Sequence, residues 1–340
     1  MINALQHVGQ GVRDIDKTYR FYKRFFGYKV KLCDLTIPDQ EMAPIIGSVE
    51  EVRALMAINP RGGGILELIE FKSCPPKPPP DEGGYGNLGI LEVGYAVRNI
   101  DHVVARLVAQ GIQFLTPVYD IRLSEGRTWR CAYLLDPDGL RLQLVEEMES
   151  VHPAVGRPEI RGIQYVGIGV SNLSNAMAFY QSFLEFDRLI HTSAGHIPEM
   201  DALTHGPILF KTAILERSRP TQRASDFLPA GTVKLFEVPG YPGKHIYEGR
   251  RWGDIGCMEF CLDVTDIEAT IAKINAGGIE TFLNPAEIDM GSGTKGVVAY
   301  IRDPDGTTVE LVEVRSVAWV STPIFTRIAL PFLRLYDRLT

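Results

Sequence analysis

A sixteen-residue segment occurs twice in this chain of 340 residues, and the repetition constrains the fold more than any other feature. The segment AYLLDPDGLRLQLVEE begins at Ala132, and AYIRDPDGTTVELVEV begins at Ala299, 167 residues later. The same offset relates two strand-like stretches, Glu92–Val97 and Glu259–Val264. A chain that repeats itself at one fixed distance is built from similar structural parts. We therefore predict two similar halves.

Each half divides again into two units. Four stretches are alike, and each leads through a polar turn into a helical pattern: HVGQGV, EVGYAV, YVGIGV and EFCLDV. Strand-like segments follow each helical pattern, and the tetrapeptide DPDG in each half favours a hairpin turn. The predicted units, each a strand, a helix and about three strands, are residues 1–73, 87–148, 160–239 and 254–315. The predicted domains are residues 1–150 and 160–315, followed by a helical tail at 316–340.

Composition excludes several classes of protein. Apolar residues make up 45% and charged residues 23%, as in a soluble globular protein, and the net charge of −7 argues against nucleic-acid binding. No run of 18 apolar residues is present, and the N-terminus lacks the pattern of a signal peptide. The five cysteines form no CxxC pair, so we expect reduced thiols and a cytoplasmic protein.

The opening strand of each unit has one unusually empty face. Because side chains alternate along a strand, His7, Gly9 and Gly11 share a face, and the other opening strands repeat this arrangement of one functional side chain followed by short residues. The opposite faces are mainly large and apolar, as a core requires. We interpret the emptier faces as concave ligand-holding surfaces. The alternative is that the glycines permit bulges or close packing.

With these strands, the helices that contain Phe-Tyr and the DPDG endings, the chain resembles the vicinal oxygen chelate superfamily. That superfamily includes glyoxalase I, methylmalonyl-CoA epimerase, extradiol dioxygenases and bleomycin-resistance proteins. The resemblance covers residues 1 to about 315. It implies an α+β fold of two tandem glyoxalase-like domains, each with two βαβββ units in a concave mixed sheet. It also implies one divalent metal ion, and Fe, Mn, Ni, Zn, Co and Mg are not distinguished.

The resemblance places the metal ligands on the first and last strands of paired units. If unit one pairs with unit two, the ligands are His7, Glu67, Glu92 and Gln143. The other sheet then holds Lys234, which would repel a metal ion, and Tyr165, which we expect in the wall of the substrate pocket. If unit one pairs with unit four instead, the ligands are His7, Glu67, Glu259 and Glu310. The sequence leaves both pairings open.

The ligand types favour one class of reaction. Ring-cleaving dioxygenases need two histidines and one carboxylate around iron, whereas these sets are rich in carboxylates. Such a set suits proton abstraction next to a carbonyl, with Glu67 or Glu92 as the catalytic base. The sequence therefore predicts an isomerase, epimerase or lyase that acts on an oxygenated small molecule. The alternatives are a ring-cleaving or other non-haem metal dioxygenase, and a non-catalytic protein that binds a small molecule.

The C-terminal tail has the pattern of an amphipathic helix that docks on an apolar surface. Apolar residues and arginines alternate at helical spacing between residues 322 and 340, although Pro331 interrupts the pattern. We expect this segment to dock on the protein's own surface or on a second copy of the chain in a homodimer. Peripheral membrane contact is the lesser expectation.

Overall fold

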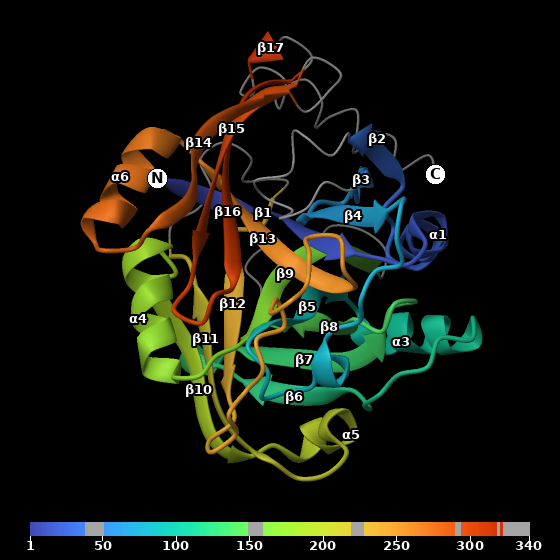
Figure 1. Cartoon of the computed structure of the whole chain (residues 1–340). Helices are drawn as coiled ribbons and strands as arrows, with labels where there is room; N and C mark the ends of the chain where they lie inside the picture. Colours follow the sequence, from blue (N-terminus) through green and yellow to red (C-terminus); the bar gives the residue numbers. More distant parts are fainter. Residues whose placement is uncertain (38–50, 149–158, 219–227, 290–293, 318–319, 322–340) are drawn as a thin grey trace.

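The computed structural model describes residues 1–37, 51–148, 159–218, 228–289, 294–317 and 320–321 (Figure 1). Within these ranges the chain forms four units, each an opening strand, a helix and three further strands, as predicted. None of the helices in the described part of the chain has the length and apolar character that crossing a bilayer requires. The helical tail was expected at 316–340, but residues 316–317 end one strand and Val320–Ser321 form another, so its first part is extended rather than helical. Residues 322–340 lie outside the described residues.

The four units have similar elements in the same order. Unit one comprises β1 (Ile2–Gly11), α1 (Ile15–Phe25), β2 (Val30–Ile37), β3 (Val52–Ile58) and β4 (Ile65–Phe71). Unit two comprises β5 (Gly89–Arg98), α3 (Ile100–Ala109), β6 (Tyr119–Arg122), β7 (Thr128–Leu135) and β8 (Arg141–Glu147). Unit three comprises β9 (Glu159–Gly169), α4 (Leu173–Phe183), β10 (Arg188–His196), β11 (Leu209–Glu216) and β12 (Thr232–Glu237). Unit four comprises β13 (Gly256–Val264), α6 (Ile267–Ala276), β14 (Thr281–Asp289), β15 (Lys295–Arg302), β16 (Thr308–Val317) and the short β17 (Val320–Ser321).

The helices form where the apolar spacing predicts them. The α1 helix begins after Asp14, whose side chain accepts a 2.8 Å hydrogen bond from the backbone N–H of Lys17 and so caps the first turn. Its buried side chains recur at helical spacing and pack into the core. In α3, Ile100, Val103 and Leu107 are buried whereas Val108 is exposed, so the apolar side that packs on the core is narrow.

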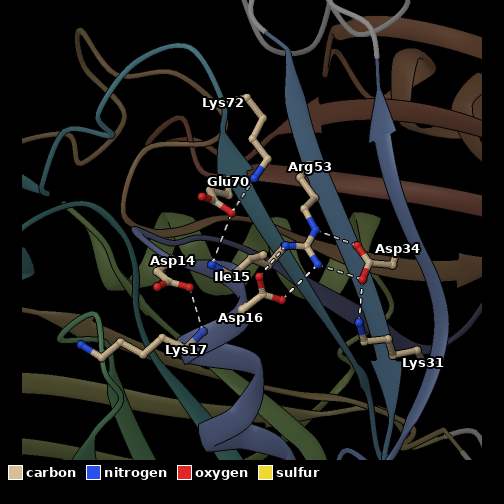
Figure 2. A network of polar contacts seen from close by, with 9 residues as sticks. All are labelled: Asp14, Ile15, Asp16, Lys17, Lys31, Asp34, Arg53, Glu70 and Lys72. Carbon is tan, nitrogen blue, oxygen red and sulfur yellow. Dashed lines mark hydrogen bonds and ion pairs between the residues drawn. The ribbon is translucent and has the colours of Figure 1, made fainter.

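The outer face of unit one carries a network of charges (Figure 2). Arg53 on β3 contacts Asp16 on α1 at 2.9 Å and Asp34 on β2 at 2.8 Å. Hydrogen bonding to Arg53 lowers the pKa of Asp34 to about 2. Glu70 on β4 contacts Lys72 at 3.2 Å. These contacts hold α1 against the strands, and their acidic groups already have basic partners.

Units pair across the two halves of the chain. One sheet has the strand order β14-β15-β16-β13-β1-β4-β3-β2, and the other has β10-β11-β12-β9-β5-β8-β7-β6. Unit one therefore joins unit four in what we call the first cup, and unit two joins unit three in the second cup (Figure 1). Of the two pairings that the sequence leaves open, the structure has unit one with unit four, so the ligand set drawn from units one and two does not assemble. All four opening strands have the same alternation, so the pattern of one strand does not select its partner.

The two sheets share one hydrophobic core. The apolar faces of the opening strands and the buried sides of all four unit helices belong to a single cluster. Phe26 of unit one packs edge-on against Tyr95 of unit two, and Tyr180 of unit three stacks on Phe260 of unit four. Because the large side chains face this shared core, the opposite faces of both sheets become the concave ones.

The DPDG turns also join the two sheets. Asp136 accepts 2.9 Å hydrogen bonds from two backbone N–H groups of its own turn, and the Tyr22 hydroxyl of α1 donates to the same carboxylate at 3.2 Å. Tyr180 of α4 donates to Asp303 in the same way at 2.9 Å. Burial raises the pKa of each of these two aspartates to about 6. The turns thus anchor each helix to the opposite sheet, a role beyond the predicted hairpin.

Candidate metal site

Four of the predicted residues meet in the first cup, and the strand register explains why. Gly9 on β1 lies opposite Glu259 on β13 and Glu67 on β4. His7, two residues earlier on β1, lies opposite Cys261. Cys261 in turn is in register with Glu310 on β16, so these functional side chains occupy two adjacent rows of the sheet.

The side chains converge on a small volume. His7 Nε2 lies 2.9 Å from Glu310 Oε2 and 3.3 Å from Glu67 Oε2. Two groups of possible ligands share His7: one adds Glu67 and Glu259, and the other adds Cys261 and Glu310. Within each group, one ligand atom of each residue lies within 4.8 Å of the others. All five residues are buried. The two groups share His7, and the distances within each group suit ligands of one ion.

Gly9 leaves the room for this convergence. A β-carbon at this position would lie 2.9 Å from Glu259 Oε1 and 3.1 Å from Glu67 Oε2. Any side chain would therefore push the two carboxylates away from each other. The glycine thus admits both carboxylates at this point of β1, and a ligand on this face stays a prediction.

The neighbouring Gln6 orients the imidazole. Gln6 Oε1 lies 2.9 Å from His7 Nδ1, and an amide oxygen only accepts hydrogen bonds, so Nδ1 carries a proton. Nε2 is then the nitrogen that faces the carboxylates. Burial alone would lower the pKa of His7, but Cys261, Glu67 and Glu310 outweigh burial and raise it well above its ordinary value. These acidic neighbours therefore favour the protonated form of His7.

The carboxylates lack donors of their own. Both oxygens of Glu259 are buried without a hydrogen-bond partner among the described residues. Glu67 Oε2 and Glu310 Oε2 face the His7 ring without the alignment of a hydrogen bond. Burial, with the charges of Glu310 and Glu67, raises the pKa of Glu259 well above its ordinary value. Unsatisfied buried carboxylates are costly, and imidazole with carboxylate oxygens suits a divalent cation, so these residues fit a metal ion.

The other predicted site residues lie in the second cup. Glu92 accepts hydrogen bonds from the hydroxyls of Tyr165 at 2.6 Å and Tyr133 at 2.8 Å, and from Tyr85. Lys234 Nζ contacts Glu92 at 3.3 Å. The carboxylate oxygens of Glu92 therefore already have donors within the same chain.

This arrangement corrects the first of the two ligand sets. Glu92 and Gln143 are not brought to His7 and Glu67, because they belong to the opposite sheet. Gln143 lies beside the Tyr165 hydroxyl and donates to Tyr119 at 2.8 Å. The alternative set, with Glu259 and Glu310, is the one that the structure brings together.

Cys261 is the residue that the sequence reasoning missed. It stands among the short residues that follow Glu259 on the empty face of its strand, four positions after Cys257. The structure separates these two cysteines, because the β1–β13 register shifts between them and Cys257 enters the core. The available signal was its position two residues after Glu259, which places it on the same strand face.

Comparisons with known proteins agree with this fold. Two family models match, at residues 6–132 and 162–311, and both are described as the glyoxalase/bleomycin resistance protein/dioxygenase superfamily. Lactoylglutathione lyase of Schizosaccharomyces pombe is 23% identical over 317 residues, which is 91% of this chain and 96% of the relative. Glyoxalase I of Saccharomyces cerevisiae is 24% identical over 331 residues, 91% of each chain. Their names support the predicted lyase or isomerase type.

Solved structures share the same architecture. Glyoxalase I from Zea mays has a TM-score of 0.56 at 16% identity, with coverage of 98% of this chain and 96% of the other. A Bacillus subtilis protein described as a candidate dioxygenase has a TM-score of 0.58 at 14% identity, with coverage of 96% and 91%. At these identities the likeness concerns the fold alone. The predicted family and its tandem α+β fold are confirmed.

Proposed function

This chain belongs to the glyoxalase/bleomycin resistance protein/dioxygenase superfamily, and from that premise we propose that its first cup binds one divalent metal ion and transfers a proton next to a substrate carbonyl. The observation that carries the proposal is the buried cluster of three carboxylates around one imidazole, in which both oxygens of Glu259 lack a partner among the described residues. The predicted isomerase, epimerase or lyase follows from this cluster.

Four side chains would hold the metal ion. His7 would bind through Nε2, because Gln6 occupies Nδ1, and Glu67, Glu259 and Glu310 would each offer a carboxylate oxygen. A bound divalent ion supplies Lewis acidity, which polarises neighbouring substrate oxygens and stabilises negative charge on them. Cys261 lies close enough to be a further neighbour of the ion.

The sum of the charges in the cluster allows one carboxyl group to be protonated. Three ionised carboxylates carry three negative charges, and a divalent cation with a neutral imidazole compensates two of them. One carboxyl group can therefore hold a proton without leaving excess positive charge. We assign this role to Glu259, since one of its free oxygens can take up a proton while the other faces the metal position. Glu67, the base candidate from the sequence, is the second choice.

The substrate class follows from the reaction. A metal ion that polarises neighbouring oxygens requires a substrate with two such oxygens and a C–H bond next to a carbonyl. Lactoylglutathione, which appears in the name of the fission-yeast relative, is a thioester of this kind and is the first compound to test. The dioxygenase alternative has less support, because the cluster found among the described residues contains one histidine rather than two.

Proton exchange tests this proposal directly. Metal-loaded protein in deuterated water is expected to exchange the C–H proton next to the carbonyl of lactoylglutathione, followed by NMR. Glu259→Gln should retain the metal ion and slow the exchange by about 10²–10⁴-fold, because the base is lost. Tyr165→Phe, which changes a buried polar group of the second cup, is the control and should exchange normally. Exchange at the full rate in Glu259→Gln would refute the assignment of the base, and no exchange in the wild type would refute the reaction.

The cellular setting is a further part of the proposal. All five cysteines are unpaired thiols, as expected for a protein in a reducing compartment, and we place the enzyme in the cytoplasm on that ground. A homodimer formed through the tail also remains a prediction.

A further inference from the structure

The second cup contains a cavity of its own. Its volume is about 250 Å³, and it opens on the concave face of the sheet made by units two and three. The lining combines apolar and aromatic walls, such as Ile121 and Phe236, with polar groups and with charged groups of both signs, among them Ser193, Thr212, Lys234 and Glu199. This volume lies slightly below the usual range for drug-sized ligands, so the cavity suits a smaller molecule.

Lys234 is the polar group on which a ligand could be held. The residue is 4% exposed, and its ammonium donates to Tyr133 at 3.0 Å and to Glu92 at 3.3 Å. These are its two hydrogen bonds within the described part of the chain, whereas an ammonium has three donors. The Phe236 ring lies 4.9 Å from the same nitrogen and covers one side of it. One N–H of a buried cation therefore remains for an acceptor in the cavity.

The same residues make a metal ion unsuitable here. Lys234 occupies the place that Glu67 has in the first cup, because each is in register with a glycine of an opening strand. The lone pairs of Glu92 are already used by three hydroxyls and the ammonium. The site therefore presents a donor where the first cup presents acceptors.

We propose that this cavity is a second, metal-independent binding site for a small organic carboxylate. The carboxylate accepts the free N–H of Lys234, and charge-assisted hydrogen bonds of this kind are among the strongest in proteins. The hydroxyls of Ser193 and Thr212, which lie 2.7 Å from each other on the cavity wall, are further polar contacts. The aromatic and aliphatic walls select an apolar body. The proposal does not depend on the reaction assigned to the first cup.

Titration with sodium benzoate tests the proposal. Protein treated with a chelator is titrated with benzoate, and binding is measured by calorimetry and by the fluorescence of Trp129, which stacks on Tyr165 with ring centroids 5.8 Å apart. We expect saturable binding without metal. Lys234→Met should weaken it about tenfold or more, because a hydrogen bond to a charged group is lost. Lys72→Met, which changes a lysine on the outer face of unit one, should leave binding unchanged.

Two further variants distinguish a loss of binding from a failure to fold. Lys234→Met leaves Glu92 without its cation, so the double variant Lys234→Met/Glu92→Gln removes both charges together and should still fail to bind. Ser193→Phe fills the cavity from its wall, keeps the ion pair intact and should also abolish binding.

Several results would overturn the proposal. Chelator-treated wild type without saturable binding would do so, and so would equal affinity in wild type and Ser193→Phe. Binding that appears only when metal is restored would assign benzoate to the first cup. Benzamide that binds as tightly as benzoate would refute the carboxylate class, since the neutral amide has the same shape.

Discussion

The two cups share one backbone plan and differ in how their polar groups are satisfied. The corresponding residues are His7 and Tyr165, Glu67 and Lys234, Glu259 and Glu92, and Glu310 and Gln143. In the first cup, three carboxylates share one imidazole, and neither oxygen of Glu259 has an aligned hydrogen bond among the described residues. In the second cup, one carboxylate receives three hydroxyls and one ammonium. In our proposal the first cup takes its cation from outside, whereas the second has the ammonium of Lys234.

The glycines of the opening strands show the same contrast. A β-carbon on Gly94 would lie 1.8 Å from the Tyr165 ring, and one on Gly167 would lie 2.1 Å from Glu92 Cγ. At Gly9 the nearest atoms are carboxylate oxygens, which can rotate away. Space left by glycine is thus filled by the chain in the second cup and by converging ligand atoms in the first. An empty strand face in a sequence does not by itself reveal which use it has.

The largest effect on stability is expected from breaking the ion pair of the second cup. Lys234→Met leaves the Glu92 carboxylate buried with one partner fewer, which should lower the free energy of unfolding by about 3–5 kcal/mol. Urea unfolding of metal-free protein measures this change. The double variant with Glu92→Gln should recover part of the loss. A Lys234→Met protein as stable as wild type would show that this pair contributes nothing to the difference between the cups.

Substitution of a glycine in each cup should affect stability in one case and metal binding in the other. Gly167→Ala forces its methyl group against Glu92, and we expect a loss of about 1–3 kcal/mol without an effect on metal content. Gly9→Ala spreads the carboxylates of Glu259 and Glu67, so it should weaken metal binding with a smaller loss of stability. Unfolding curves and metal titrations of both variants measure the two effects. Equal metal affinity in Gly9→Ala and wild type would argue against ligands on either side of Gly9.

A smaller effect is expected in the pH dependence of metal-free protein. The pKa of Glu259 is raised in the folded chain, so the folded state keeps a proton that the unfolded chain releases above its ordinary pKa of 4.5. The free energy of unfolding should therefore fall as the pH rises above 4.5, and His7 adds a further fall above 6.5 for the same reason. Glu259→Gln should make the decline shallower, as measured by urea unfolding at several pH values. Glu70→Gln on the outer face is the matched control, and an equal slope in wild type and Glu259→Gln would contradict the buried, donor-poor carboxylate.

The fold could be predicted from the sequence to the level of the units. Local geometry and burial determine the repeat, the DPDG turns and the alternation of Val166, Ile168 and Val170. These features can therefore be recognised in a single sequence. The pairing of units was not predictable, because all four opening strands offer the same apolar face. The partner of β1 decides whether Glu92 or Glu259 reaches His7, so the candidate ligand set was predictable only as two alternatives.

The environment of Glu92 was also beyond the sequence. Its donor Tyr85 lies between the predicted units, and Tyr133 is the second residue of the repeated segment, yet nothing local relates either hydroxyl to the carboxylate. Cys261 is visible at its strand position, two residues after Glu259, but its contact with His7 and Glu310 is not. Positions in the repeat could be predicted, whereas contacts between distant positions could not.

Elemental analysis of the gently purified protein tests the central claim most directly. Wild type and Tyr165→Phe should each contain about one divalent metal ion per chain, while His7→Ala and Glu67→Ala should contain almost none at equal folded fraction. The account predicts that only first-cup substitutions empty the site. Equal metal content in all four proteins, or no metal in the wild type after incubation with divalent ions, would contradict it.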